Sequence, residues 1–548
     1  MQRKVIVVVV AAVVLAGSAA PAWADHTHPR ERLAATEDPG STELITRGEG
    51  TWEFIRNFPP NPGTDIKLFK KKGRLFAVTG TLGQANEQHV GQRFIRLINL
   101  YGKIKPMWRA DHGSSNCPTA NPAGTTGLQH DQTVTPAKNP VLMIDTTDAT
   151  GRCHDPGGGG LEIVDISRIH KKKFQPREIH LTRHAGTSHT VTLDATRPWI
   201  LYNNASQSSG MSWIDVVDIR SCLKAVKAKT LGGKRKACRP KVSRIPFRPE
   251  WSQRINGAGE RIEGTESSCH DITARPGRIY CANLNSTIVL DVKNLTNDRG
   301  AIRGSSLPCK VVDGTRTKAK VTDCADPELS GGLARGWKYI GHVNHPGRNG
   351  SHNTNTEYER TEGVAVSHEA EPTPDGKWMF VTDERGGGIV PGGASCSEVP
   401  NPYENGGVHV FNISQGGEFQ YAQDVDGNNA VFLGEVVVPS PTFCTAHVME
   451  QIAGEQRFSI AWYTQGTKIV DWFVNPQSQW SFRETASVVP QGPPATTWTS
   501  LVFKKLRNDD GTVTYYFIAS DIARGIDVFS WTGPANPNGS PPPTLPVE

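Results

Sequence analysis

Five histidines stand at the same point of a pattern that repeats along this 548-residue chain. They are His130 in LQHDQTVTP, His189 in TSHTVTLD, His270 in SCHDITARPG, His368 in SHEAEPTPD and His447 in TAHVMEQIAG. The first copy of the pattern has Asp65 in this place, and the last has Thr499 or Trp498. Imidazole is a neutral nitrogen ligand that suits iron, copper or zinc. If the fold brings the copies together, the five histidines predict a divalent transition-metal site.

Two interpretations of these histidines stay open on the sequence alone. A histidine at the start of a strand also serves as a structural residue that bonds a backbone group of the neighbouring repeat. Imidazoles held together without a metal or an anion would lower one another's pKa, which favours a bound ligand. The acidic residues one place further on, Asp131, Asp271 and Glu369, should alternate away from the channel and orient the rings or balance charge.

The elements that must position the histidines recur seven times. A strand ending in a Val-Asp-Ile-like tripeptide appears as FIRLINL, GGLEIVDIS, SWIDVVDIR, STIVLDV, GGVHVFNIS, GTKIVDWF and ARGIDVFSW. Before each lies a strand rich in aromatic and β-branched residues, as in KWMFVTD, and a further strand before that. With a fourth strand per copy, the pattern predicts an all-β, seven-bladed β-propeller of four-stranded antiparallel blades, because such repeats bury their faces only by stacking. The first strand of each blade is then innermost, which places the histidines at the channel mouth.

The predicted propeller spans residues 46–532 and closes through its N-terminal strand. The last copy ends near Trp531, one strand short, and TWEFIRNF before the first copy resembles the missing strand. We expect it to complete the last blade and so remove an exposed sheet edge. Two long insertions, around 222–265 and 293–360, are expected to be surface loops.

The repeat resembles the LVIVD-repeat family of secreted bacterial β-propellers, which is named for the third-strand signature. The resemblance covers about residues 46–531, with departures in the insertions and a loose match at 523–531. TPDGKWMFVTDE is also similar to the YVTN-type propeller repeats. These resemblances imply the propeller fold and no single reaction.

Both ends of the chain differ in composition from the repeats. Residues 1–24 combine a basic start, an apolar run and an Ala-x-Ala ending, which predicts a secretory signal and a secreted protein. Residues 25–45 should be flexible, and residues 533–548 form a proline-rich tail. No later segment is apolar enough to span a membrane. The net charge of +6 is small, and the basic stretches HKKKFQPR and GGKRKACRPK are interpreted as solvated loops. We therefore expect a monomer that binds no nucleic acid.

Ten cysteines in an exported chain indicate disulfides. Sequence alone does not determine the connectivity, but pairing neighbours keeps every bridge local: Cys117 with Cys153, Cys222 with Cys238, Cys269 with Cys281, Cys309 with Cys324, and Cys396 with Cys444.

Other candidate residues carry weaker signals. Asp383, Glu384 and Arg385 in TDERGGG, with Asp521 and Arg524 in ASDIARG, are interpreted as turn residues and interblade salt bridges. The remaining histidines of interest are expected in a disordered tail or in solvated loops: His26, His28, His154, His342, His345 and His352. The glycine runs match neither a P-loop nor a dinucleotide motif, and GxSxG, HExxH and EF-hand patterns are absent from the sequence.

Two functions follow from these observations. The first is a metal-dependent enzyme, for instance an oxidoreductase, with His130 or Asp65 as a further ligand or proton carrier. Such a site would be similar to that of carotenoid-cleaving oxygenases, which hold iron through four histidines from separate propeller blades. Methanethiol oxidases of the selenium-binding type are also propellers. The sequence shares no motif with either family. The second is a binding or scaffold module that captures an extracellular ligand on its long loops.

Overall fold

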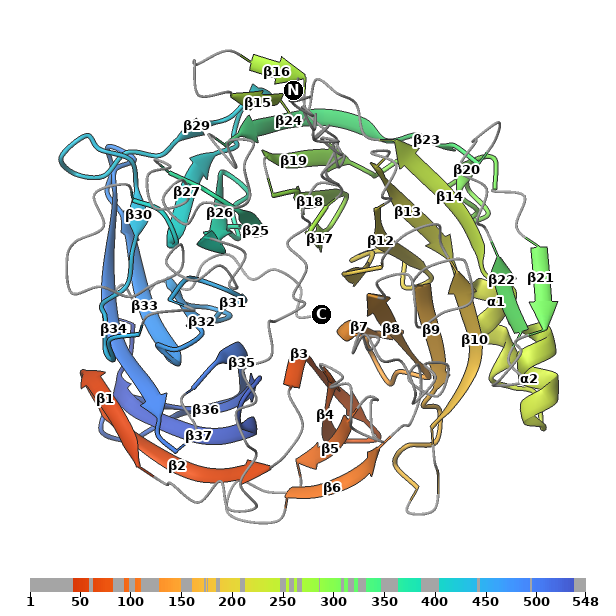
Figure 1. Ribbon diagram of the computed structural model, residues 1–548, viewed down its shortest axis with the longest axis horizontal. Helices are drawn as coiled ribbons and strands as arrows, with labels where there is room; N and C mark the ends of the chain where they lie inside the picture. Colours follow the sequence, from red (N-terminus) through yellow and green to blue (C-terminus); the bar gives the residue numbers. More distant parts are fainter. Residues whose placement is uncertain are drawn as a thin grey trace, which may run out of the picture.

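The computed structural model describes most of the ring and parts of its insertions. The described residues are 43–58, 63–81, 93–97, 104–109, 128–148, 160–171, 174, 176–183, 188–206, 212–246, 253–255, 261–263, 269–284, 286–306, 310–313, 320–323, 332–345, 363–385, 404–440, 444–492 and 495–536. Within these ranges the chain forms antiparallel sheets that stand side by side around a central axis (Figure 1). The protein is therefore a β-propeller, as the repeat predicts.

The first sheets of the ring, given from the axis outward, follow the order of the chain. One contains β3 (Gly63–Lys71), β4 (Arg74–Thr81), β5 (Arg93–Leu97) and β6 (Ile104–Arg109). The next contains β7 (Leu128–Thr135), β8 (Leu142–Asp148), β9 (Gly160–Asp165) and β10 (Arg177–Arg183). The third contains β11 (Val191–Leu193), β12 (Ile200–Ser206), β13 (Ser212–Asp218) and β14 (Lys241–Pro246). The fourth contains β17 (Asp271–Arg275), β18 (Arg278–Ala282), β19 (Ser286–Asp291) and β24 (Lys338–Asn344).

The remaining sheets complete the circuit. One contains β25 (Ser367–Pro372), β26 (Trp378–Asp383), β27 (Val408–Asn412) and β29 (Gln420–Tyr421), with β30 (Val431–Phe432) also beside β27. The next contains β31 (Met449–Gln451), β32 (Arg457–Ala461), β33 (Thr467–Val474) and β34 (Trp480–Pro490). The last along the chain contains β35 (Thr497–Arg507), β36 (Thr512–Asp521) and β37 (Gly525–Pro534).

Two N-terminal strands extend neighbouring sheets. β1 (Leu44–Gly48) pairs with β34, and β2 (Thr51–Phe58) pairs antiparallel with β37. The ring of Trp52 in β2 lies 5.5 Å from the ring of Phe517 and 5.5 Å from that of Phe529. β1 begins two residues before the predicted propeller boundary at residue 46, and β37 ends two residues after the one at residue 532.

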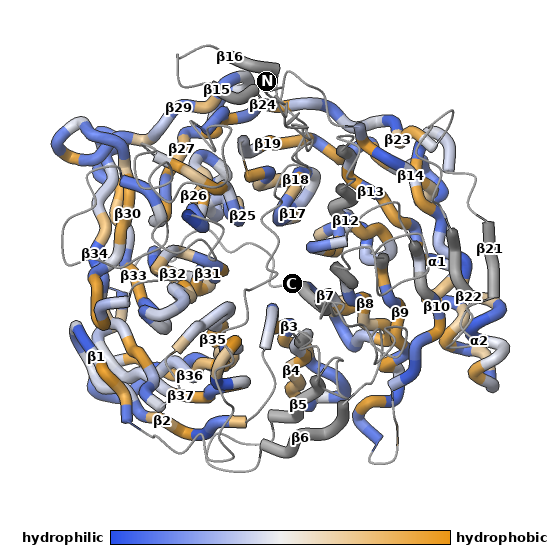
Figure 2. The backbone as a smooth tube through the Cα atoms, in the orientation of Figure 1, coloured by the Kyte–Doolittle hydropathy of each residue, from blue (hydrophilic) through white to orange (hydrophobic). Residues whose placement is uncertain are grey.

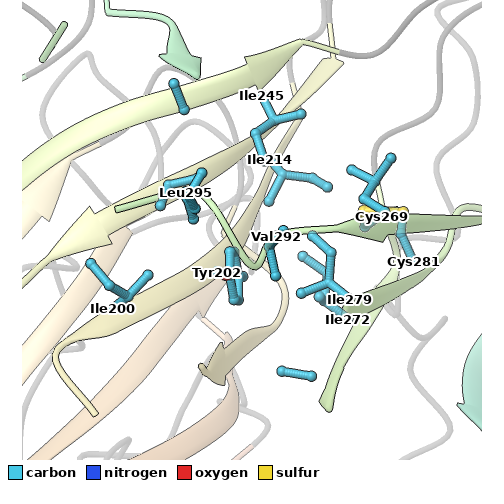
Figure 3. Close-up of a cluster of buried hydrophobic side chains, with 14 of the residues drawn as sticks. Ile200, Tyr202, Ile214, Ile245, Cys269, Ile272, Ile279, Cys281, Val292 and Leu295 are labelled. Atoms are coloured by element: carbon cyan, nitrogen blue, oxygen red, sulfur yellow. A yellow bond between two sulfur atoms is a disulfide. The ribbon is translucent and has the colours of Figure 1, made fainter. Parts of the chain in front are cut away.

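Second strands such as β18, β26, β32 and β36 are buried on both faces along nearly their whole length, which explains why they read as apolar runs. In β26 all six residues are buried, and alternate side chains join different cores. Met379 and Val381 pack toward the preceding sheet, whereas Trp378 and Phe380 pack toward the following one. Figure 2 shows hydrophobic and hydrophilic residues alternating along many strands, and Figure 3 shows one of the cores between neighbouring sheets.

The long insertions are ordered onto the ring where they are described, which differs from the expectation of plain surface loops. Residues after β13 form two short helices, α1 (Arg220–Ala225) and α2 (Leu231–Ala237). The later insertion contributes β20 (Arg303–Gly304) with β23 (Ala334–Arg335), and a hairpin of β21 (Lys310–Asp313) and β22 (Lys320–Asp323) that extends the sheet of β10. Two further pieces are the hairpin of β15 (Gln253–Ile255) and β16 (Arg261–Glu263), and β28 (Gly417–Glu418), which pairs with β24. β22 and β28 cover the sheet edges of β10 and β24, which would otherwise be open, whereas β15 with β16 and β20 with β23 form separate two-stranded sheets.

Two of the predicted disulfides are confirmed, Cys222–Cys238 and Cys269–Cys281. Cys444 is also disulfide-bonded, and its predicted partner Cys396 lies outside the described residues, as do Cys117, Cys153, Cys309 and Cys324. The signal segment and residues 537–548 of the proline-rich tail lie outside them too, whereas β37 extends into the first residues of the predicted tail. Neither helix of the described ranges has the length and apolar character needed to cross a bilayer.

Candidate metal site at the channel mouth

Four of the five predicted histidines lie next to one another in a row. The ring centroids of His189 and His270 are 4.2 Å apart, those of His270 and His368 are 4.6 Å apart, and those of His368 and His447 are 4.1 Å apart. All four side chains are buried. The side chain of His130 lies outside the described residues, although its backbone belongs to β7. The fold thus brings together residues that are far apart in sequence.

A bulge interrupts the pairing at the start of four first strands, β3, β7, β25 and β35. In β25, Ser367 pairs with Asp383 and Glu369 pairs with Thr382, which leaves His368 as an extra residue. Trp498 is the extra residue in β35, between Thr497 and Thr499. A bulge leaves one residue unpaired and re-aims its side chain. Trp498, one of the two candidates for the last copy, is therefore the residue equivalent to the histidines.

The alignment of Asp65 with the histidines is wrong by one place. Gly63 pairs with Thr81 and Ile66 with Thr79, so the bulge of the first copy contains Thr64 and then Asp65. β7 has the same bulge, in which the order is His130 and then Asp131. Asp65 is thus equivalent to the acidic residue that follows each histidine, because the bulge starts one residue earlier than the sequence alignment assumed.

The acidic residues form a separate layer that joins neighbouring sheets. Asp131 accepts a hydrogen bond from the backbone N–H of Val191 at 2.8 Å, and Glu369 accepts one from the N–H of Met449 at 2.7 Å. Asp65 accepts from the Thr499 hydroxyl at 2.7 Å. Burial, together with the nearby Asp65, raises the pKa of Asp131 to about 8. These carboxyl groups bond a neighbouring blade, instead of orienting the histidine rings as expected.

Glu384 is the site residue that the sequence interpretation missed. Its carboxylate Oε2 lies 3.9 Å from His368 Nε2, and its Oε1 lies 3.6 Å from His447 Nε2. The chain returns to the channel mouth at this point, because the N–H of Glu384 bonds the carbonyl of Val366 just before His368. The signal available in the sequence was an acidic residue directly after a buried second strand. The interpretation as a turn residue is therefore wrong for Glu384.

Asp383, Asp521 and Arg524 do fit the interpretation as turn residues and salt-bridge partners. Asp383 accepts hydrogen bonds from the N–H groups of Val366 and Gly406 at 2.7 Å and 2.6 Å. Asp521 accepts from the N–H groups of a turn, and Arg524 pairs with Asp527 at 2.8 Å. These side chains hold backbone in place away from the histidine row.

A backbone carbonyl fixes the proton of His447. Its Nδ1 lies 2.7 Å from the carbonyl oxygen of Trp498, which can only accept a hydrogen bond. Burial lowers the pKa of His447 to about 3, so the ring is neutral and carries its one proton on Nδ1. Its Nε2 therefore presents a lone pair, and this is the nitrogen that faces Glu384.

Two aromatic side chains border the same region. The hydroxyl of Tyr463 donates a hydrogen bond to Glu384 Oε1, and its ring centroid lies 4.8 Å from that of His447. The centroid of the Trp498 ring lies 4.5 Å from that of His447. Burial, with the nearby carboxylate of Glu384, raises the pKa of Tyr463 well above its usual value, so the hydroxyl remains a donor.

The donors fit a transition metal. Candidate ligand atoms of His270, His368 and Glu384 all lie within 4.8 Å of one another, and all three side chains are buried. Two imidazole nitrogens and a carboxylate oxygen suit zinc or iron, with ligand bonds of about 2.0 to 2.2 Å. His189 and His447 flank this group and extend it on both sides.

Other histidines outside the row differ from expectation. His345 is buried, not solvated, and its Nε2 lies 2.8 Å from the Thr287 hydroxyl, which is 2.8 Å from the Ser367 hydroxyl. His342 lies within β24, 3.0 Å from Asn344 Nδ2. His342 belongs to β24 and His345 directly follows its end, so neither lies in the solvated loop that was expected. His26, His28, His154 and His352 lie outside the described residues.

No protein-family model matches the chain, and no curated protein matches it in sequence. Among solved structures the chain is similar to the periplasmic gluconolactonase of Pseudomonas aeruginosa, at 11% identity and a TM-score of 0.40 over 88% of this chain and 99% of that one. It is similar to the PQQ domain of pyranose dehydrogenase from Coprinopsis cinerea, at 8% identity and a TM-score of 0.33 over 89% and 97%. It is also similar to the Cps50 (Swd1) β-propeller domain of Myceliophteria thermophila, at 9% identity and a TM-score of 0.37 over 88% and 99%. The function of this chain therefore rests on the geometry of its own site.

Proposed function

We propose that this protein binds a divalent transition metal, iron, copper or zinc, at the mouth of its central channel and uses it in oxidoreductase chemistry. The observation that carries the proposal is the buried convergence of His270, His368 and Glu384 within 4.8 Å. His189 and His447 flank this group, and the repeat adds His130 as a further candidate ligand. Three protein ligands leave coordination positions for water or substrate, which is the usual arrangement of catalytic metal sites.

The proton on His447 supports a cation at this place. Because its Nδ1 donates to a carbonyl, its Nε2 and Glu384 Oε1 are two hydrogen-bond acceptors only 3.6 Å apart. Two such acceptors repel each other in a buried environment unless a proton or a cation lies near both. A metal ion beside Glu384 would turn this repulsion into attraction.

The chain's own residues have distinct tasks around the metal. The bound ion would supply a Lewis acid and, for iron or copper, a centre that changes oxidation state. The bulge of β25 holds the imidazole of His368, and the Trp498 carbonyl orients His447. Tyr463 keeps a proton on its hydroxyl and orients Glu384, while the buried walls limit the access of water.

The test is metal content, measured by mass spectrometry on untagged protein. We expect nearly one equivalent of iron, copper or zinc in the parent and none in a folded His270→Ala/His368→Ala variant. His180→Ala is the matched control, because His180 is also buried but lies in β10, far from the axis. A parent without metal, or a double variant that keeps it, would refute the proposal.

We also make a proposal about the number of blades, the closure of the ring and the location of the protein. We infer that the ring has seven blades, that β2 closes it, and that the protein is a secreted monomer of the LVIVD-repeat type. The pairing of β2 with β37 and the two disulfides support this view. Disulfides persist in oxidising compartments outside the cytosol.

A second candidate is a binding module without turnover. It is favoured by the insertions, which are held on the outer sheets by added strands and by the Cys222–Cys238 bridge. Ordered insertions on a rigid ring suit the capture of an extracellular ligand. This function would survive the loss of His270 and His368 and would fail when the insertions are removed.

A further inference from the structure

The helices α1 and α2, with the residues that join them to β14, form a basic hairpin that we define as residues 220–241. No residue from 219 to 249 is acidic. The exposed lysines of the basic hairpin are Lys224, Lys227, Lys229, Lys236 and Lys241. Within the described residues, two side chains of this segment form ion pairs: Arg220 pairs with Asp218, and Lys234 pairs with Asp165. The exposed lysines therefore carry positive charge that no carboxylate of the described residues neutralises by an ion pair.

The ring holds the basic hairpin in a fixed position. Cys222, Ala225 and Cys238 are buried in the core that the sheets of β8 and β13 share. The Cys222–Cys238 disulfide ties the two helices together, and the Thr230 hydroxyl caps α2 by accepting from the N–H of Gly233 at 3.0 Å. Figure 1 shows both helices on the outside of the ring, beside β10 and β22. The charges are thus displayed by a rigid platform and not by a loose loop.

From this arrangement we propose that the basic hairpin is a docking surface for an acidic polysaccharide, a linear chain of sulfate or carboxylate groups. Several exposed lysines on one disulfide-tied hairpin match closely spaced anions by Coulomb attraction. The described part of the segment contains no aromatic residue on which a nucleobase could stack. Among described residues, the exposed large apolar side chains are Leu333 and Val425, so the basic hairpin has none to insert into a lipid bilayer.

The proposal is independent of the metal site and is tested by fluorescence anisotropy with a labelled heparin oligosaccharide. We expect binding that weakens steeply with salt, because each lysine contact releases about one counterion. The variant Lys224→Glu/Lys227→Glu/Lys236→Glu should lose at least about tenfold in affinity, because three contacts are reversed in sign. The corresponding alanine variant, expected to weaken binding less, serves if the glutamates prevent folding.

The matched control is Lys70→Glu/Lys338→Glu/Lys377→Glu, which changes the net charge equally at exposed lysines outside the basic hairpin. It should keep its affinity within about threefold of the parent. Equal losses in the control and the hairpin variant would show attraction by net charge alone and overturn the proposal. It would also be overturned by hairpin-dependent binding to anionic phosphatidylglycerol vesicles or duplex DNA with none to heparin. Binding that follows the hairpin lysines and the polysaccharide would establish the surface.

Discussion

The strand β2 should contribute a large part of the stability of the ring, and two side chains allow its contribution to be measured. Phe58 is 3% exposed and packs with Ile518 and Ile526, so Phe58→Ala should cost about 4 kcal/mol of unfolding free energy. Trp52 is half-buried against β36 and β37, so Trp52→Ala should cost about half of the usual tryptophan range, about 2 kcal/mol.

The two losses should add. Trp52 and Phe58 are about 20 Å apart along the strand and belong to different cores, so the double variant should lose about 6 kcal/mol. Typical domains have only about 5 to 15 kcal/mol in total. A chain that starts near Gly63 and lacks the strand should therefore not form a folded protein.

The assay is guanidinium unfolding followed by circular dichroism, with Glu53→Ala as the control. Glu53 is exposed on the same strand, so its loss should change the midpoint little. The reasoning fails if Phe58→Ala and Trp52→Ala shift the midpoint no more than Glu53→Ala does. It also fails if the truncated chain unfolds cooperatively with the parent's midpoint, because the ring would then not depend on β2.

Three further changes test the site, a disulfide and a buried carboxyl. Tyr463→Phe should weaken metal binding about 10- to 100-fold and alter the visible spectrum of the Co²⁺-loaded protein. Tyr515→Phe, which removes a similar buried hydroxyl away from the channel, should leave both unchanged. Replacing Cys222 and Cys238 by serine should cost about 3 kcal/mol in unfolding free energy, because a loop with a sequence separation of 16 is released in the unfolded chain; an unchanged midpoint would contradict this. Burial raises the pKa of Asp521 to about 6 from 3.8, so its folded form holds a proton that the unfolded chain releases earlier. The parent should therefore lose about 2 kcal/mol more than Asp521→Asn as the pH rises from 4 to 7, and parallel stability curves would refute it.

The repeat alone determined the class of fold and the place of the histidines. Alternating apolar strands at a regular spacing can bury both faces only between neighbouring sheets, so the propeller follows from the pattern. His189, His270, His368 and His447 converge because equivalent positions of a closed ring face one axis. The two disulfides were also predictable, because each joins cysteines that are neighbours in the sequence.

Only the tertiary structure decided which other residues belong to the site. Glu384 and Tyr463 occupy the same place in their repeats, because each follows the histidine of its own sheet by 16 residues (384 − 368 and 463 − 447). The spacing did not reveal, however, that the glutamate and the tyrosine of two different sheets meet each other and His447. The one-place shift of Asp65 arose from a bulge, which depends on pairing between strands and not on residue type. Contacts between blades are set by how the sheets pack, so the carboxylate and the hydroxyl at the channel mouth became visible only in three dimensions.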